Sequence, residues 1–200
     1  METLTAIKER RSVKHYDKEY EIPKNEVKQL LESALLSPTS YNLQHWRIVQ
    51  ITDPSLKEQI REAAWGQAQV TDASLLFLLC ANIKAWNESP EQYWTETPQE
   101  VIDMIVPTID PFYNGKEQLQ RDEAMRSVGI LAQTMMLAAK SMDYDSSPMI
   151  GFDSEKIAEL INLPENHVIG MMLAIGKGIK PANPRGGQLP LDKILIKNKF

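Results

Sequence analysis

The chain has 200 residues, 42% of them hydrophobic and 24% charged, and its 22 basic and 27 acidic side chains give a formal net charge of -5. This composition is typical of a globular protein, and the charge excludes a general basic face for nucleic acid. No apolar run approaches the roughly 18 residues of a membrane span, and the N-terminus lacks a signal peptide. We expect a cytoplasmic protein of one domain, residues 1–200, with neither a nucleic-acid nor a membrane partner.

Two helices and a polar loop are expected in the first 46 residues. The first helix covers Glu2 to Arg10, with cations in its last turn. Pro23 suits the first position of the second helix, which must end before Pro38 because a residue that precedes proline leaves the helical region. One face of this helix is apolar, with Val27, Leu30, Leu31, Ala34 and Leu35. Ser37–Trp46 follows as a loop rich in hydrogen-bonding side chains, which is typical of a binding loop.

The next segments predict a strand, a helix, a second loop and a central strand. Residues 46–51 read as the first strand, and Asp53-Pro54 begins a helix that runs to about residue 64. The loop at 65–70 contains Gln67 and Gln69, which in isolation also fit an exposed polar loop. Residues 74–81 form a continuous apolar run, so we expect a central strand that is buried on both faces. The single cysteine, Cys80, lies in it and is expected to be an inert thiol.

Residues 82–120 form an excursion from this scaffold. Four prolines interrupt it, short helices are expected at about 90–93 and 98–106, and aromatic residues are concentrated in it. Such a segment either covers a pocket or packs on a partner subunit, and its composition does not distinguish the two.

The last third of the chain predicts a long helix, a connector, a short helix, a strand and a tail. The long helix covers Arg121 to Met142 and is apolar around much of its circumference, so it belongs in the core or at a subunit interface. Residues 146–153 read as a turn-rich connector. A short helix at 154–161 and a strand at 167–175 follow, then a loop-like tail at 176–187. Ile194–Ile196 predicts a last edge strand.

Several catalytic patterns are missing from the sequence. No phosphate-binding glycine loop, zinc-protease motif or nucleophile elbow appears, and the histidines are scattered at positions 15, 45 and 167, so we expect neither a metal site nor a serine triad. Arg10–Lys14 by itself is either a solvated helix end or an anion site. Polar loops at strand ends with basic residues near both termini suit a phosphorylated cofactor that supplies the reactivity itself.

Five segments, in order and spread over nearly the whole chain, resemble the flavin-binding blocks of the nitroreductase family. They are Arg10–Lys14, Pro38–Trp46, Gln67–Gln69, Pro148–Phe152 and Arg185. The resemblance implies an α+β fold, with a mainly antiparallel sheet flanked by helices, in an intertwined FMN-dependent homodimer. It places two flavin sites at the subunit interface.

The resemblance also implies roles for individual residues. Arg10, Ser12 and Arg185 would bind the ribityl phosphate, and Arg11 would assist. Lys14 would stabilise the anionic reduced flavin from the pyrimidine edge, with no other catalytic residue required. Further implied cofactor contacts are Pro38, Thr39, Ser40 and Asn42, of which Thr39 and Ser40 would come from the partner chain. Gln67, Gln69 and Met149 are also implied contacts. The backbone amides of Ile150 and Gly151 would lie near N5 and the C4 oxygen of the flavin.

The implied activity is hydride transfer from NAD(P)H through flavin N5 to a nitroaromatic, quinone or similar acceptor by a ping-pong mechanism. Candidate pocket residues are Tyr41, Trp86, Trp94, Phe112 and Tyr113. The alternatives are a flavin enzyme of the same fold that removes halogen or fragments the flavin, and an FMN-binding dimer without turnover. Two departures from the family are His45, where proline is frequent, and Ile150, where some members are acidic. Which of Lys177, Lys180 and Arg185 reaches the phosphate stays open, as does the choice of NADPH or NADH.

Overall fold

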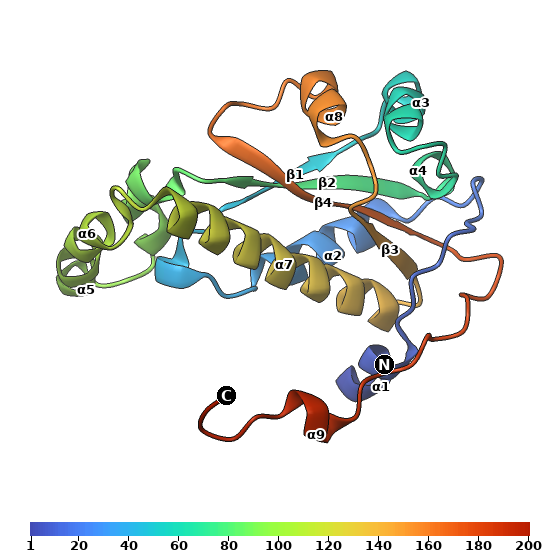
Figure 1. Cartoon of the computed structure of the whole chain (residues 1–200). Coiled ribbons are helices and arrows are strands. Elements are labelled where there is room, and N and C mark those ends of the chain that lie inside the picture. Colours follow the sequence, from blue (N-terminus) through green and yellow to red (C-terminus); the bar gives the residue numbers. More distant parts are fainter.

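A computed structural model describes residues 1–200 and shows a four-stranded antiparallel sheet between two helical layers (Figure 1). The strand order is β1-β2-β4-β3, and every neighbouring pair is antiparallel. The strands are β1 (Trp46–Gln50), β2 (Leu75–Asn82), β3 (Asp145–Met149) and β4 (His167–Gly176). The predicted α+β class with a mainly antiparallel sheet is therefore confirmed.

The interior strand β2 is the centre of the fold. All eight of its residues are buried, because helices cover both faces of the sheet and the strand is apolar from Leu75 to Ala81; only its last residue, Asn82, is polar. It pairs with β1 on one side and with β4 on the other, as its prediction as a central strand requires. Cys80 lies inside this strand, and burial raises the pKa of its thiol to about 11, which agrees with the expected inert thiol.

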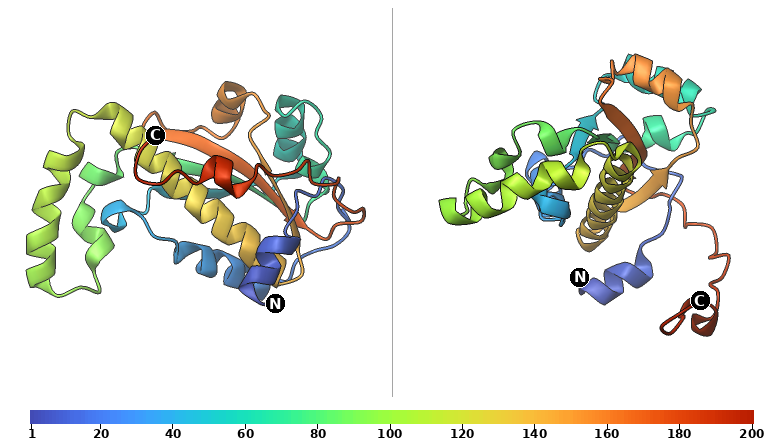
Figure 2. Two further views of the ribbon diagram at one scale, coloured as in Figure 1. Left: turned by 60° about the horizontal axis from the view of Figure 1, so that its bottom comes forward. Right: turned by 60° about the vertical axis from the view of Figure 1, so that its left-hand side comes forward.

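Two helical layers enclose separate cores on the two faces of the sheet (Figure 2). One layer contains α1 (Thr3–Glu9), α2 (Lys24–Leu35) and α7 (Glu117–Ser141). The other contains α3 (Pro54–Ala63), α4 (Gln69–Asp72) and α8 (Ser154–Leu160). Asp53 caps α3 as predicted, since its carboxylate accepts a 2.7 Å hydrogen bond from the backbone N–H of Leu56. None of the helices combines the length and apolarity that crossing a bilayer requires.

The excursion at residues 82–120 forms a third, smaller core at one end of the sheet (Figure 1). Its centre is made by Leu43, Trp86, Ile109 and Tyr113. It is built from η2 (Ala85–Asn87), η3 (Pro90–Trp94), α5 (Gln99–Ile105), η4 (Val106–Thr108) and α6 (Ile109–Tyr113). The short helices predicted here are present, and α7 begins at Glu117 rather than at Arg121.

Two predicted elements were wrong. Residues 145–149 are the strand β3 rather than part of a turn-rich connector. Its sequence is polar and short, and Pro148 is tolerated because β3 is an edge strand that needs hydrogen bonds on one side only. Residues 194–196 are not a strand, because Ile194 ends the short helix α9 (Leu191–Ile194) and no strand of the chain lies beside the tail.

Candidate functional site

A polar cavity of 330 Å³ lies between the end of α1 and the tail that follows β4. We call it the basic cavity. No hydrophobic residue lines it, and its walls are Arg10, Arg11, Ser12, Lys14, Asn183, Pro184, Arg185, Gly186 and Gln188. The structure thus brings together the N-terminal and C-terminal cations that the resemblance assigned to one phosphate.

The first wall of the basic cavity is fixed to the sheet by backbone contacts. After α1 ends at Glu9, the chain turns and runs along the edge strand β3. Ser12 forms an isolated parallel bridge with Ser146, and the N–H of Val13 donates to the Ser146 carbonyl at 3.0 Å. Val13 is buried in the core, so the side chains of its neighbours are held toward solvent.

The second wall is tied to the first by arginine side chains. Nη2 of Arg185 donates to the carbonyls of Lys8 at 2.9 Å and Arg10 at 3.1 Å. Nη2 of Arg11 donates in the opposite direction, to the Asn183 carbonyl. These hydrogen bonds hold the guanidinium groups of Arg11 and Arg185 close to Arg10, although their like charges repel.

The charge on Arg10 is poorly compensated within the chain. Burial, together with the positive charges of Arg185 and Arg11, lowers the pKa of its guanidinium. Its Nη1 is buried and has no hydrogen-bond partner, and a buried charged donor without a partner is costly. An anion with several acceptor oxygens would satisfy this donor and relieve the repulsion. The arrangement is therefore suited to a phosphate group.

The other two basic residues of the tail do not line this cavity. Nζ of Lys177 pairs with the carboxylate of Asp143 at 2.8 Å and lies 4.9 Å from the ring centre of Tyr144. Hydrogen bonding and charge attraction by Lys177 lower the pKa of Asp143. Lys180 is exposed and absent from the walls. Of the three candidates in the tail, Arg185 is the one in the basic cavity.

A second group of predicted residues forms a hydrogen-bonded corner on the α3 and α4 side. Nε2 of Gln67 donates to the Gly151 carbonyl at 2.8 Å, and Nε2 of buried Gln69 donates to Oε1 of Gln67 at 3.0 Å. We call this the glutamine corner. Met149 is buried where β3 ends, whereas the side chain of Ile150 is 79% exposed. The corner fixes the carbonyl of Gly151 directly after this exposed side chain.

The predicted 38–42 contacts lie elsewhere in the chain. Ser40–Asn42 forms a 3-10 turn in which Tyr41 and Asn42 have positive φ angles. Nδ2 of Asn42 donates to the Tyr93 carbonyl at 2.6 Å, and Oγ1 of Thr39 accepts from the N–H of Gln44. Neither these residues nor Pro38 line the basic cavity. A single chain therefore does not assemble all of the predicted cofactor contacts.

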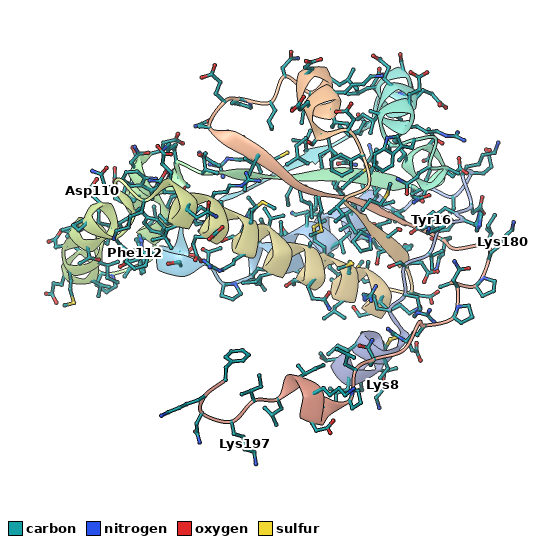
Figure 3. All side chains as sticks on the ribbon, viewed as in Figure 1. Lys8, Tyr16, Asp110, Phe112, Lys180 and Lys197 are labelled. Atoms are coloured by element: carbon teal, nitrogen blue, oxygen red, sulfur yellow. The ribbon has the colours of Figure 1, made fainter.

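The predicted pocket residues divide into packed and accessible ones. Trp86 and Tyr113 are buried in the third core, with ring centres 6.2 Å apart, so within the chain they are core residues rather than a pocket wall. Phe112 is 40% exposed and packs on Tyr41 at 5.5 Å, and Trp94 is half-buried. Figure 3 labels Phe112 at the α6 end of the molecule and Lys180 at the opposite end.

Sequence reasoning missed part of the basic cavity. Asn183, Gly186 and Gln188 line the basic cavity, but loop residues of these types give no signal without the fold. No group of three or more His, Cys, Asp or Glu side chains is arranged to hold a metal ion.

Comparison with known proteins gives one consistent result. The model of the nitroreductase family matches residues 7–177. Protein DrgA of Synechocystis sp. is 50% identical over 100% of this chain and 97% of its own length. The oxygen-insensitive NADPH nitroreductase of Helicobacter pylori is 27% identical, covering 94% of this chain and 93% of that protein. The crystal structure of a protein from Exiguobacterium sibiricum in complex with FMN superposes with a TM-score of 0.90 at 30% identity, covering 98% of this chain and 97% of that one. This chain belongs to the nitroreductase family.

Proposed function

We propose that this protein is an NAD(P)H-dependent FMN oxidoreductase that reduces nitroaromatic, quinone or similar acceptors by a ping-pong mechanism. The observation that carries the proposal is the basic cavity, in which a buried, unpaired guanidinium N–H faces like charges. The Exiguobacterium relative in complex with FMN and the Helicobacter relative named as an NADPH nitroreductase support the cofactor and the reductant. Bound FMN would take hydride from the nicotinamide and pass two electrons to the acceptor.

In this proposal the basic cavity holds the phosphate of FMN. Arg10 and Arg185 would supply charge-assisted hydrogen bonds, Ser12 a hydroxyl donor, and Arg11 a further positive charge. These residues fit a phosphate group, because Nη1 of Arg10 has no hydrogen-bond acceptor within the chain and a phosphate oxygen would serve as one. Lys14 lines the same cavity, and we assign it the stabilisation of negative charge on the reduced ring.

The glutamine corner would orient the ring system. Gln67 fixes the carbonyl of Gly151, and the N–H of Gly151 donates to no backbone acceptor in the chain. That N–H, beside the amide of Ile150, is free to contact the flavin edge. Gln69 holds the side chain of Gln67 in place, so the orientation is set before the cofactor binds. The protein supplies position and charge, and none of these groups needs to act as an acid or base.

We propose further that the protein is an intertwined homodimer in which the 38–42 loop completes the partner's site. The loop does not line the basic cavity of its own chain. It is therefore available to contact the cofactor bound by the partner chain. The tail supports the same proposal, because residues 189–200 expose a run of large apolar side chains without covering any core of their own chain. They are Leu189, Leu191, Ile194, Leu195, Ile196 and Phe200. Such a surface is normally buried against another chain.

The excursion at 82–120 would then belong to the same domain, residues 1–200, and act as a cover. Its third core packs against Leu43 in the loop that the dimer is proposed to share. Phe112, Tyr41 and Trp94 are its more accessible aromatic residues and would border the acceptor pocket. Trp86 and Tyr113 would support this border from within the third core.

Reconstitution with FMN followed by reduction tests the function. We expect the purified protein to bind about one FMN per chain, and anaerobic NADH or NADPH to bleach the flavin absorbance. A nitrofuran, a naphthoquinone and free FMN, each tested as acceptor with both nicotinamides, would then identify the acceptor class. A protein that takes up no FMN on titration would overturn the proposal. One that binds FMN but is bleached by neither nicotinamide would be a binding module rather than an enzyme.

A further inference from the structure

The turn between α6 and α7 contains Asn114, the only asparagine of the chain that directly precedes a glycine. Asn114 and Gly115 lie just after Tyr113, the last residue of α6, and both are exposed. Gly115 has a φ of 70°, in the left-handed region, so the turn favours a glycine at this position. Asn114 is extended, with φ of -59° and ψ of 132°, and its own backbone therefore does not require an asparagine.

The side chain of Asn114 is weakly held. Its Nδ2 lies 3.3 and 3.4 Å from the two carboxylate oxygens of Asp110, which is the long end of the range for a hydrogen bond. Because the residue is exposed, no packing fixes its rotamer. Its Cγ is therefore free to turn toward the backbone of Gly115.

The amide nitrogen of Gly115 is equally accessible. Its N–H donates to no backbone acceptor in the chain, and a Cβ built on Gly115 would meet nothing within 4 Å. One backbone hydrogen bond spans the turn, from the N–H of Lys116 to the Tyr113 carbonyl at 3.1 Å. Rotation of ψ at Asn114 breaks this bond, which lies at an exposed residue where water can replace it.

An accessible Asn-Gly pair can undergo deamidation. The Gly115 nitrogen loses its proton and attacks Cγ of Asn114; the N–Cγ bond forms, the Cγ–Nδ2 bond breaks, and ammonia leaves with a proton. Water then opens the five-membered succinimide at either of its two carbonyls, which gives an aspartyl or an isoaspartyl linkage. Nothing is oxidised or reduced, and water is the only other reactant. Glycine favours the reaction because no Cβ crowds the attacking nitrogen.

The modified residue would lie at the joint between the third core and α7. Tyr113 is buried at the centre of this core, and its carbonyl accepts a 2.9 Å hydrogen bond from Nε2 of Gln120 in α7. A carboxylate at position 114 would stand four residues after Asp110, a spacing at which like charges repel. The isoaspartyl linkage would also add a methylene to the main chain directly after Tyr113. Both changes weaken the joint.

We propose that Asn114–Gly115 is a site of spontaneous deamidation through a succinimide, and that the isoaspartyl product loosens the joint between the third core and α7. This modification goes beyond the proposed function, because it requires neither FMN nor a nicotinamide. The turn directly follows α6, at the end of the molecule where Figure 3 labels Asp110 and Phe112, opposite to Lys180.

Storage of the purified full-length protein in a mildly alkaline buffer tests the site. Isoelectric focusing should show a form with one additional negative charge that accumulates with time, and tandem mass spectrometry should place the change at residue 114. Labelling by protein isoaspartyl methyltransferase should detect the isoaspartyl linkage. A peptide of residues 110–118 gives the reaction without the fold. A protein that keeps its charge while this peptide is fully deamidated would overturn the proposal.

Three variants test the mechanism. Asn114→Gln should stop the charge gain, because its longer side chain would have to close a six-membered ring. Gly115→Ala should slow it although Asn114 is kept, since the methyl group crowds the nitrogen and contacts nothing else in the fold. Asn87→Gln, a change at an exposed asparagine that precedes Glu88, is the matched control and should keep the wild-type rate. Equal rates in wild type and Asn114→Gln, or a product without isoaspartate, would overturn the succinimide route.

Amide hydrogen exchange tests the loosened joint. In the isoaspartyl form, separated by anion exchange, α6 and the first turn of α7 should exchange faster than in the unmodified protein, whereas β2 and β4 should be unchanged. Asn114→Asp carries the charge without the added methylene and should show a smaller increase. Identical exchange of α6 in the isoaspartyl and unmodified forms would overturn this part of the proposal.

Discussion

The basic cavity and the aromatic end of the molecule, made by residues 37–46 and 82–120, both contain buried donors without partners, but of different kinds. In the basic cavity the donor is the charged guanidinium of Arg10, with Arg11 and Arg185 nearby. At the aromatic end the donors are neutral, such as Nε1 of Trp86 and the hydroxyl of Tyr93. One buried water satisfies a neutral donor, whereas a cluster of like charges requires an anion. The first region therefore has the chemistry of an anion site, whereas the second has that of a packed aromatic core.

The largest expected effect tests the proposed dimer, in which the 38–42 loop of one chain would complete the basic cavity of the other. Deleting residues 189–200 leaves every residue of the basic cavity in place and removes the exposed apolar tail. We expect the protein to become monomeric and FMN to bind more weakly by at least about 100-fold, since the 38–42 loop of the partner is lost. Sedimentation and flavin titration measure both. Deleting only residues 198–200 is the control, and a truncated monomer that keeps its full FMN affinity would show that one region suffices.

Arg10→Leu tests the charged region directly. Replacing the guanidinium by an apolar group should weaken FMN binding by about 2–3 kcal/mol, the cost of losing charge-assisted hydrogen bonds. The apoprotein should be no less stable than the wild type, because a buried, unpaired charge and its repulsions disappear with Arg10. Flavin titration and urea unfolding of the apoprotein measure the two effects. A less stable apoprotein with unchanged FMN affinity would make Arg10 a structural residue.

Arg185→Ala should also weaken FMN binding, by about 1–3 kcal/mol, but with the opposite effect on the apoprotein. Its Nη2 donates to the carbonyls of Lys8 and Arg10, so its loss should destabilise the apoprotein by about 1 kcal/mol. Lys180→Ala is the matched control, because this cation lies in the same tail but outside the cavity. Equal losses of FMN affinity in both variants would show that general tail charge, rather than the cavity, attracts the cofactor.

The aromatic end has a pH dependence of its own. His45 is 1% exposed, its Nδ1 lies 3.0 Å from Oγ of Ser127, and burial, aided by the charge of Arg47, lowers its pKa to about 4. The unfolded pKa is near 6.5, so the unfolded state binds the extra proton first, and stability present above pH 6.5 is lost as the pH falls toward 4. Between pH 7 and 5 this loss should reach about 2 kcal/mol.

Urea unfolding at the two pH values checks this dependence. His45→Asn should remove the loss that His45 causes, whereas His15→Asn, a change at an exposed histidine, should keep the slope of the wild type. If His45→Asn leaves the dependence of stability on pH unchanged, His45 is not the group that titrates.

The periodicity of apolar residues predicted the helices and strands that are specified by buried side chains. The buried Leu30 and Ala34 of α2 and the apolar run Leu75–Ala81 of β2 were visible in the sequence because burial selects such residues, although Leu35, predicted on the same face of α2, is exposed. β3 was missed because its backbone bonds to β4, rather than a side-chain pattern, make it a strand. The tail was misread as a strand because Ile194–Ile196 is apolar, although no edge within the chain accepts it. Apolar character alone did not distinguish a strand from an exposed apolar tail.

The candidate site was predicted from the resemblance more than from local pattern. Spacing does not show that Arg10 and Arg185 share a cavity, since 175 residues separate Arg185 from the Arg10 carbonyl that it binds. The contacts of Asn42 with Tyr93 and the exposure of Trp65 depend on the three-dimensional path of the chain. Sequence reasoning recovered residues whose charge or amide group limits their role, and missed Asn183, Gly186 and Gln188, which line the basic cavity only because of the path of the tail.

The smallest expected effect concerns the glutamine corner, which lies outside both regions. Gly151→Ala would bring a methyl group to 3.1 Å from Cζ3 of Trp65 and 3.8 Å from Nε2 of Gln67. The indole is exposed and can shift by a few tenths of an ångström, so we expect a loss of stability below about 1 kcal/mol and little change in FMN affinity. Thermal unfolding and flavin titration measure these. A large loss of FMN affinity would mean that the added methyl group displaces the 150–151 backbone rather than the exposed indole, and that the glutamine corner is as rigid as the proposed phosphate site.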